Sequence, residues 1–178
     1  GKTYPFENSS VRAILEDKYG NLLFGTEDNG LYIISQYSSK AAKIQNYTSE
    51  NSGMVYNILQ SLFIDGSHNL WIGTLSGLSK ADLKRKKFTL YRKSNIPNSL
   101  DLSGNVIASL YKDDDGILWV GNWGQGLNKV NRKTGEVEHF STRLTGNHKI
   151  PNDFVHVIFK DHLIFIKTKK HYYCGPSV

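Results

Sequence analysis

The stretch Val11-Arg-Ala-Ile-Leu-Glu-Asp-Lys-Tyr-Gly-Asn-Leu-Leu-Phe-Gly-Thr26 decides the fold, because its pattern returns along the chain at a constant interval of 48 residues. Each copy begins with an apolar run that ends at an aspartate, namely Asp17, Asp65, Asp113 or Asp161. The copies superimpose in this region without an insertion or deletion. Each one is therefore a structural unit of a repeat protein.

The first three copies also agree beyond the aspartate. Gly25, Gly73 and Gly121 keep the 48-residue interval, and each copy then continues with a Gly-Leu pair and an aromatic segment. Within a copy, four short runs rich in Val, Ile, Leu and aromatic residues are separated by clusters of Gly, Asn, Asp and Ser. This alternation is typical of strands joined by turns.

The turn after the first run has the composition of a tight hairpin. In Asp17–Asn21 the glycine accepts a positive φ, and the Asp and Asn side chains can bond to their own backbone. No window places apolar residues at helical spacing over more than about two turns. The sequence therefore predicts an all-β protein, a β-propeller built from four-stranded blades of about 48 residues.

We expect residues 1–178 to form a single partial propeller. The expected blades are a first at about 11–49, a second at about 57–93, a third at about 105–142 and a partial fourth at about 154–173. The fourth copy loses the pattern after residue 163, and the tail that follows matches nothing upstream. This decay favours a truncated or frame-shifted reading of the tail over a genuine closing strand.

Closure of the ring has three alternatives. The segment 2–6 resembles the aromatic last strand of a copy, so it could complete the fourth blade of the same molecule or that of a partner in a homodimer. The chain could instead be a piece of a longer propeller, with exposed blade edges that pair between chains. Each alternative supplies the neighbour that a four-stranded blade needs to cover both faces.

The composition is that of a globular β protein, with 39% hydrophobic residues and a net charge of +6. The densest basic run, Lys84–Lys87, falls where the repeat predicts a solvated turn, so we expect no nucleic-acid partner. No apolar run reaches the length of about 18 residues that a membrane helix needs. We therefore expect no direct membrane contact of this chain.

The sequence offers no catalytic or metal-binding constellation. It has no nucleophile motif and no paired carboxylates on one expected face, and its histidines occupy unrelated positions of the repeat. Only His156, on an expected innermost strand, is predicted to face the central channel. The lone Cys174 with His171 would leave a tetrahedral metal site half empty. We expect no enzymatic activity, no metal and no cofactor.

The repeat Val-x-x-Ile-x-x-Asp-x-x-Gly-Asn-Leu-Trp-Ile-Gly-Thr, followed by Gly-Leu and a terminal Phe or Tyr, resembles the two-component regulator propeller repeat. Residues 69–74 carry the motif almost letter for letter, and the resemblance covers about residues 2–162. It implies the periplasmic sensory region of a hybrid two-component sensor of Bacteroidetes, in which propellers precede a β-sandwich, a membrane helix and a histidine kinase. This chain carries no kinase motif. The resemblance further implies an oligosaccharide as the ligand class.

The residues that match the family motif are expected to be structural. Trp71, Trp119 and Phe24 recur at a strand position where a large ring can wedge between adjacent blades. The aspartates at the strand ends are expected to fix the turns rather than to pair as acid and base. Ligand contacts must therefore come from other positions.

The loops that enter the innermost strand and those that link the second and third strands converge on one face of a propeller. Variation between copies at fixed loop positions is what a binding site needs, because the constant remainder of each copy serves packing. The predicted ligand-binding residues are Asn57 and Asn105 in the entering loops, and Glu27, Asp28, Ser76, Asn122, Trp123 and Gln125 in the linking loops.

Trp123 is the strongest candidate of this set. It falls in a loop where the other copies have Asp28 or Leu75, and an exposed indole offers a stacking platform for a sugar ring. Neighbouring amide side chains could supply hydrogen bonds to hydroxyl groups, and these are Asn105, Asn122 and Gln125. One alternative is that Trp123 merely covers the end of the ring. Another is that the propeller is a scaffold for protein-protein interaction or dimerisation and takes no small ligand.

Overall fold

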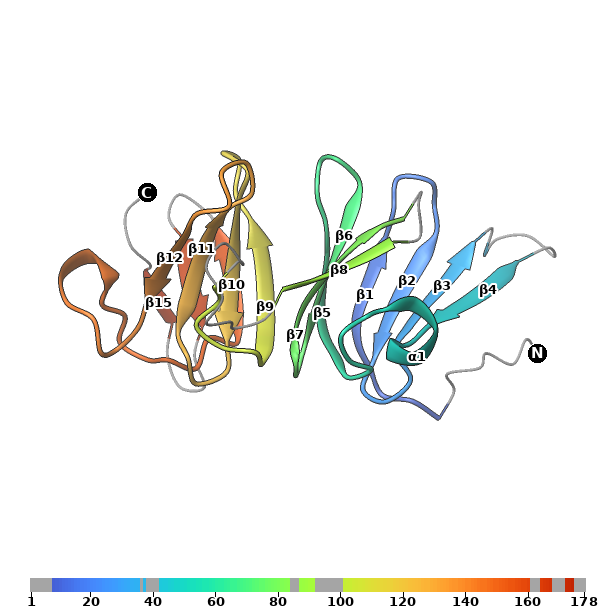
Figure 1. Ribbon diagram of the computed structural model, residues 1–178, viewed down its shortest axis with the longest axis horizontal. Coiled ribbons are helices and arrows are strands. Elements are labelled where there is room, and N and C mark those ends of the chain that lie inside the picture. The colour runs from blue at the N-terminus through green and yellow to red at the C-terminus, as the bar shows by residue number, and fades with distance from the viewer. Residues whose placement is uncertain are drawn as a thin grey trace. The chain divides into compact units, whose positions relative to one another are not determined.

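The computed structural model describes residues 8–35, 37, 42–83, 87–91, 101–160, 164–167 and 172–174. Three sheets of four strands and one sheet of three strands make up nearly all of the regular structure in this part of the chain. Figure 1 shows the strands of each sheet in colours that follow the order of the sequence. The all-β prediction is confirmed.

The chain divides into two compact units. The first comprises Gly1–Leu75 and Ser79–Leu90, and the second comprises Ser76–Leu78 and Tyr91–Val178. Sheets one and two belong to the first unit, apart from Gly77, Leu78 and Tyr91, and sheets three and four belong to the second unit.

Every four-stranded sheet is a meander in which consecutive strands pair side by side. The first sheet contains β1 Val11–Glu16, β2 Leu22–Thr26, β3 Leu31–Ser35 and β4 Lys43–Tyr47. The second contains β5 Leu59–Ile64, β6 Asn69–Thr74, β7 Gly77–Asp82 and β8 Lys87–Tyr91. The third contains β9 Ile107–Lys112, β10 Ile117–Asn122, β11 Leu127–Asn131 and β12 Val137–Phe140.

The fourth sheet has three strands in the described part of the chain. These are β13 Val157–Lys160, β14 Ile164–Lys167 and β15 Tyr172–Cys174, and they pair antiparallel in that order. The expected closing segment 2–6 and the fourth aspartate, Asp161, lie outside the described residues. Completion of this blade by the N-terminal segment therefore stays a prediction.

Two short helical turns occur in the connections between sheets, where the sequence predicted none of substantial length. Helix α1, Ser49–Ser52, lies between β4 and β5, and the 3₁₀ turn η1, Gly146–His148, lies between β12 and β13. Thr48 and Asn51 form a capping box at the start of α1. At the other end Gly53, with φ of 73°, ends the helix in the left-handed conformation that glycine adopts without strain.

The aspartates fix the hairpin turns, as predicted. Asp17 Oδ1 accepts hydrogen bonds from the backbone N–H groups of Tyr19 and Asn21, each at 2.9 Å. Asp65 and Asp113 repeat this geometry with the backbone of Asn69 and of Ile117. All three aspartates are buried, so these bonds satisfy groups that would otherwise be costly to remove from water.

The tryptophans of the motif complete these turns from the strand that follows. Trp71 Nε1 donates to Asp65 Oδ2 at 3.0 Å, and Trp119 Nε1 donates to Asp113 Oδ2 at 2.9 Å. Trp119 also joins the core between β10 and β13, where it packs with Val155 and Ile158. The ring therefore lies between neighbouring sheets, as the wedge hypothesis requires, and it carries a polar bond that the sequence analysis did not foresee.

Glycines at the constant 48-residue interval lie where neighbouring sheets pack together. A Cβ atom on Gly25 would lie 3.2 Å from Leu59 Cβ, and one on Gly121 would lie 2.7 Å from Val155 Cγ1. Leu59 and Val155 stand at the same position of the second and fourth copies, and both are fully buried. Within each unit, the start of the following copy thus packs onto the glycine of the sheet before it.

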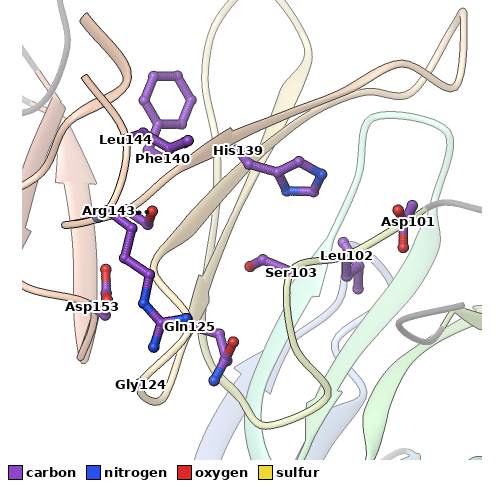
Figure 2. A pocket seen from close by; sticks show the side chains of 11 residues that line it. Asp101, Leu102, Ser103, Gly124, Gln125, His139, Phe140, Arg143, Leu144 and Asp153 are labelled. Carbon is purple, nitrogen blue, oxygen red and sulfur yellow. Dashed lines mark hydrogen bonds between the residues drawn. The ribbon is translucent and has the colours of Figure 1, made fainter. Parts of the chain in front are cut away.

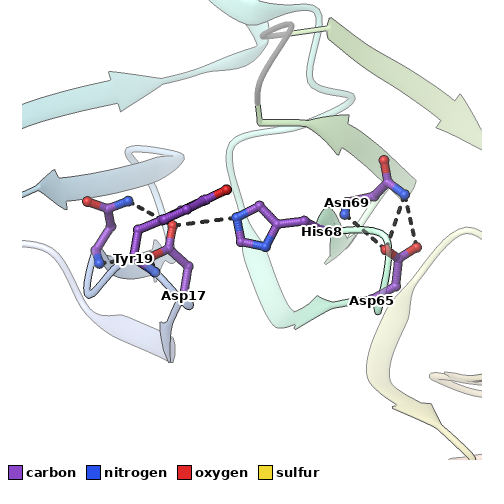
Figure 3. A network of polar contacts seen from close by, with 6 residues as sticks. Asp17, Tyr19, Asp65, His68 and Asn69 are labelled. Carbon is purple, nitrogen blue, oxygen red and sulfur yellow. Dashed lines mark hydrogen bonds and ion pairs between the residues drawn. The ribbon is translucent and has the colours of Figure 1, made fainter.

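A polar contact joins the turns of the first two copies. His68 stands where the first and third copies have Gly20 and Gly116, and it keeps the same left-handed conformation, with φ of 66°. Its Nε2 atom lies 3.9 Å from Asp17 Oδ2, and its ring meets the ring of Tyr19 edge-on at 4.9 Å (Figure 3). His68 therefore adopts a backbone conformation that favours glycine, and its side chain contacts the neighbouring sheet.

Candidate functional site

The loop Asn122–Gly126 between β10 and β11 is held on both sides by backbone hydrogen bonds within the second unit. The carbonyl of Asp153 accepts from the N–H groups of Gly124, at 3.0 Å, and Gly126, at 2.9 Å. The N–H of Trp123 donates to the carbonyl of Val106 at 2.9 Å. This loop therefore joins the segments that precede β9 and β13, and its side chains start from fixed backbone positions.

The same hydrogen bond aligns the loops of the three copies. Glu27 N donates to Ser10 O, and Leu75 N donates to Ile58 O, in the way that Trp123 N donates to Val106 O. The residue of the first copy that corresponds to Trp123 is therefore Glu27. The sequence alignment that placed Asp28 opposite Trp123 was wrong by one residue.

The indole of Trp123 is half exposed, at 50% of its surface, and rests on two rings from the following segment. Its ring meets Phe154 edge-on at 6.0 Å and His156 edge-on at 4.4 Å. An antiparallel bridge between Trp123 and Phe154 fixes their backbones. His156 thus supports Trp123, and its predicted orientation toward a central channel stays untested. These contacts hold the indole in place while leaving part of its surface open to a ligand.

A pocket of about 380 Å³ opens on the other residues of this loop, and it lies entirely within the second unit (Figure 2). Its walls come from the segment before β9, the β10–β11 loop, the end of β12, the turn that follows β12 and the segment before β13. The lining residues are Asp101, Leu102, Ser103, Gly124, Gln125, His139, Phe140, Ser141, Arg143, Leu144 and Asp153.

A hydrogen-bond network lies beneath the pocket. Asn128, fully buried on β11, accepts from Ser103 N at 2.8 Å through Oδ1, and the same oxygen faces His139 Nδ1 at 2.9 Å. Because an amide oxygen can only accept, His139 donates from Nδ1. When the imidazole is neutral with its proton on Nδ1, Nε2 has a lone pair that can accept a hydrogen bond. The network therefore sets the hydrogen-bonding character of a side chain that lines the pocket.

Asn122 belongs to this network and not to the ligand-contacting surface. Its side chain is fully buried, with Nδ2 donating to Gly104 O at 2.9 Å and Oδ1 accepting from Ser103 Oγ at 3.1 Å. Asn128 Nδ2 donates to the same Oδ1 atom. Its polar atoms hold the segment before β9, so the structure offers no open surface of Asn122 to a ligand, and the predicted contact stays untested.

Gln125 is the predicted residue that lines the pocket. Its side chain lies against Gly104, where an added Cβ would be only 2.6 Å from Gln125 Cγ. The absence of a side chain at Gly104 therefore lets Gln125 lie over the pocket. Asn105 follows Gly104 and is exposed, but it is not among the lining residues.

The predicted residues of the first unit are tied into local contacts. A hydrogen bond and ion pair from Arg12 lower the pKa of Glu27. Asn57 accepts from Ser49 N at 2.7 Å and donates to the carboxylate of Glu50, at 3.1 Å to its Oε2. Hydrogen bonds from the side chains of Thr48, Asn57 and Ser49, in that order of size, lower the pKa of Glu50 to about 2. Asn57 thus anchors α1.

The two remaining predicted residues, Asp28 and Ser76, lie in the β2–β3 and β6–β7 connections. Asp28 is exposed at the tip of the β2–β3 loop, and Ser76 is half-buried at the β6–β7 turn. Ser76 belongs to the second unit, whereas Asp28 belongs to the first. A ligand role for either of them stays a prediction.

The sequence analysis missed Asn128 and His139, although the repeat contains a signal for both. Asn128 corresponds to Tyr32 in the first copy and to Ser79 in the second, directly after the constant Gly-Leu pair. It pairs with His139 across β11 and β12, as Tyr32 pairs with Asn46 across β3 and β4. The copies thus also vary at strand positions whose side chains lie at or beneath the pocket, and not only in the loops.

Comparison with known families identifies the repeats. The family described as "Two component regulator propeller" matches residues 5–28 and 101–124. The first range contains the turn of Asp17, and the second contains the turn of Asp113 and also Trp123. Both ranges thus match the two-component regulator propeller repeat. This agrees with the resemblance seen in the sequence.

The relatives of this propeller are larger proteins. Histidine kinase P4 of Formosa agariphila is 31% identical over 159 residues, which are 85% of this chain. The chain spans 11% of that relative's length.

Solved structures share the propeller fold. The extracellular domain of the hybrid two component system BT3049 from B. thetaiotaomicron is 22% identical with a TM-score of 0.68, and the match covers 89% of this chain and 22% of that one. PorZ, a surface component of the type-IX secretion system of Porphyromonas gingivalis, is 12% identical with a TM-score of 0.73, covering 94% and 26%. Virginiamycin B lyase from Staphylococcus aureus is 14% identical with a TM-score of 0.64, covering 93% and 50%. These likenesses confirm the β-propeller fold.

One further property concerns membranes. In the part of the chain that the structure describes, no helix combines the length and the apolar character needed for a membrane crossing.

Proposed function

We propose that this chain is a non-catalytic, ligand-binding propeller segment from the sensory region of a hybrid two-component regulator, and that its loop Asn122–Gly126 recognises an oligosaccharide. The observation that carries the proposal is Trp123, whose indole is half exposed yet held edge-on by Phe154 and His156. The corresponding residues of the other copies are Glu27 and Leu75, so this ring does not serve the packing that the repeat requires.

The comparisons support the sensory part of this proposal. Histidine kinase P4 is named as a kinase, and the BT3049 match is the extracellular domain of a hybrid two component system. A sensor of that kind would carry this propeller outside the cytoplasm, in the periplasm or beyond the cell surface. Its signal would pass through parts of the protein that lie outside this sequence.

The chemistry of the site supports a carbohydrate. Sugars present an apolar face that stacks on an indole, together with hydroxyl groups that need donors and acceptors. Gln125, His139 and Ser103 line the pocket beside the loop and offer both kinds of group. Leu144, which is 39% exposed, supplies apolar surface, so the site combines stacking, packing and directed hydrogen bonds.

Trp123→Ala should weaken binding of oligosaccharides by about 10- to 30-fold, because a buried aromatic anchor contributes about 2 kcal/mol to an interface. Isothermal titration against a panel of neutral and acidic plant and algal oligosaccharides measures this loss. Intrinsic fluorescence gives a second readout, since Trp71 and Trp119 are buried and Trp123 is the tryptophan open to a soluble quencher. Bound sugar should protect Trp123 from quenching.

The matched control is Leu75→Ala, which removes an exposed apolar side chain from the corresponding loop of the second copy. This variant should bind like the original protein. Equal affinities of the original protein and Trp123→Ala would exclude the indole as the ligand platform.

A second candidate function, pairing of blades between chains, rests on the exposed face of β1. Val11 is 38% exposed and Ile14 is 64% exposed, whereas Leu59 and Val155, which correspond to Val11 in later copies, are fully buried under a neighbouring sheet. In the sequence, the fourth copy of the repeat has Lys169 where the glycine at the contact between sheets is expected. The face of β1 would therefore suit a blade from another chain, as a homodimer supplies.

Light scattering after size exclusion tests this second candidate. A homodimer should have twice the chain mass of 20.1 kDa at micromolar concentration, and Ile14→Asp should return it to the monomer mass. Tyr56→Asp is the control, since Tyr56 is also an exposed large side chain, at 41%, but lies outside β1. A mass of 20.1 kDa at every concentration would exclude stable pairing through this face.

A further inference from the structure

The pocket beside Trp123 is lined by one cationic side chain, Arg143, and by two carboxylates, Asp101 and Asp153. Arg143 lies in the turn after β12, and Figure 2 shows its guanidinium extending into the pocket toward Gln125 and Gly124. Among the described residues no carboxylate lies within ion-pairing distance of this guanidinium. Asp101 lies at the opposite end of the pocket in the same view.

The nearest-lying acidic residue of the lining, Asp153, is committed to the turn itself. Its Oδ1 atom accepts from Thr142 N at 2.7 Å, and its Oδ2 atom accepts from Thr142 Oγ1 at 2.8 Å. These two bonds occupy one lone pair of each carboxylate oxygen and hold the turn next to the loop of Trp123. Asp153 thus serves to position the segment that carries Arg143.

The backbone around Arg143 is fixed by further bonds. Ser141 Oγ accepts from Arg143 N at 3.3 Å, and Ser141 N donates to His148 O at 3.1 Å. Ile150 N donates back to Ser141 O at 3.2 Å, so the segments before and after the turn form a short parallel bridge. The guanidinium therefore projects from an ordered base.

The remaining lining separates apolar and polar surface. Leu144 is 39% exposed and offers apolar surface to the pocket, whereas Leu102 and Phe140 are almost fully buried behind it, and His139 and Gln125 supply polar groups. A sugar ring with a carboxylate at one end matches this arrangement, because its ring can lie on Leu144 and its carboxylate can meet Arg143. A guanidinium binds carboxylate through two parallel N–H bonds, which gives both affinity and orientation.

We propose that this pocket binds the carboxylate of a uronic acid unit, so that the ligand class of the propeller is an acidic oligosaccharide. The inference rests on the proposed function, since it takes the occupant to be a carbohydrate. Arg143 binds the carboxylate, and His139 and Gln125 bind hydroxyl groups of the same sugar. Trp123 does not line the pocket, so its indole contacts a different sugar unit of the same oligosaccharide.

The test compares ligands that differ only in charge. Oligosaccharides prepared from pectin, alginate and glucuronoxylan are titrated in their native form and after chemical reduction of their carboxylates to alcohols. The native form of the recognised sugar should bind at least about tenfold tighter than its reduced form, as expected for one charge-assisted bidentate contact. In Arg143→Gln this ratio should fall to about two or less, and Arg143→Lys should retain part of it.

Lys133→Gln is the matched control, because it removes the same net charge from an exposed turn outside the pocket. It should leave the ratio between native and reduced ligands unchanged. An equal loss in Lys133→Gln would assign the preference to overall charge and overturn the role of Arg143.

The outcomes also separate this inference from the proposed function. Equal binding of native and reduced ligands, both dependent on Trp123, would overturn the acidic-sugar inference and leave carbohydrate recognition standing. Absence of binding by every native and reduced oligosaccharide would overturn both. Binding that depends on Arg143 but not on Trp123 would keep the acid site and exclude the indole platform.

Discussion

Replacing Gly126 with alanine should destabilise the second unit by about 3–5 kcal/mol. Gly126 has φ of 81°, and a Cβ atom at this position would lie 2.1 Å from the carbonyl oxygen of Phe140. The left-handed conformation alone costs a residue with a side chain about 1–2 kcal/mol. Relief of the clash requires β11 and β12 to separate at Leu127, which pairs with Phe140.

Gly135→Ala isolates the conformational part of this cost. Gly135 has φ of 82°, and a Cβ atom there would meet no other atom within 4 Å. This variant should lose only about 1–2 kcal/mol. Urea unfolding, followed through the fluorescence of the buried Trp119, measures both variants. If the two alanine variants lost equal stability, the close approach of Gly126 to Phe140 would have no energetic consequence.

Asp113→Ala should cost the second unit about 3–5 kcal/mol, the second large effect. The carboxylate is almost fully buried and accepts from Ile117 N and Trp119 Nε1, each at 2.9 Å. Alanine leaves both donors buried without their acceptor, and each unsatisfied donor costs about 1–3 kcal/mol. Asp115→Ala in the same turn is the control, because Asp115 is exposed. It should change stability by less than about 0.5 kcal/mol.

A double-mutant cycle separates the bond to the indole from the rest of this loss. Trp119→Phe removes the Nε1 donor and introduces the ring type that the first copy has at Phe24. Asp113→Ala should then cost about 1–3 kcal/mol less in the Trp119→Phe background than in the original protein. Additive losses in the two backgrounds would show that the carboxylate and the indole are not energetically coupled.

The candidate site was partly predictable from the repeat. Differences between copies at constant loop positions led to Trp123 and Gln125, and the structure leaves both exposed. The same reasoning selected Asn122, which is buried, because a pattern of variation does not distinguish a side chain that faces solvent from one that holds a neighbouring segment. It also passed over Arg143, which lies in a connection that has no counterpart pattern in the other copies.

The sequence by itself determined the repeat, the four-stranded unit and the hairpin turns. These features depend on residues close in the chain, as when Asp113 binds the backbone of Ile117 and the side chain of Trp119. The pocket was decided by the tertiary structure alone. Its parts are distant in sequence, since Ser103 bonds to Asn128 and Trp123 rests on Phe154. A periodic pattern specifies local pairing in each copy, but which variable side chains meet depends on how neighbouring blades and their connecting segments pack.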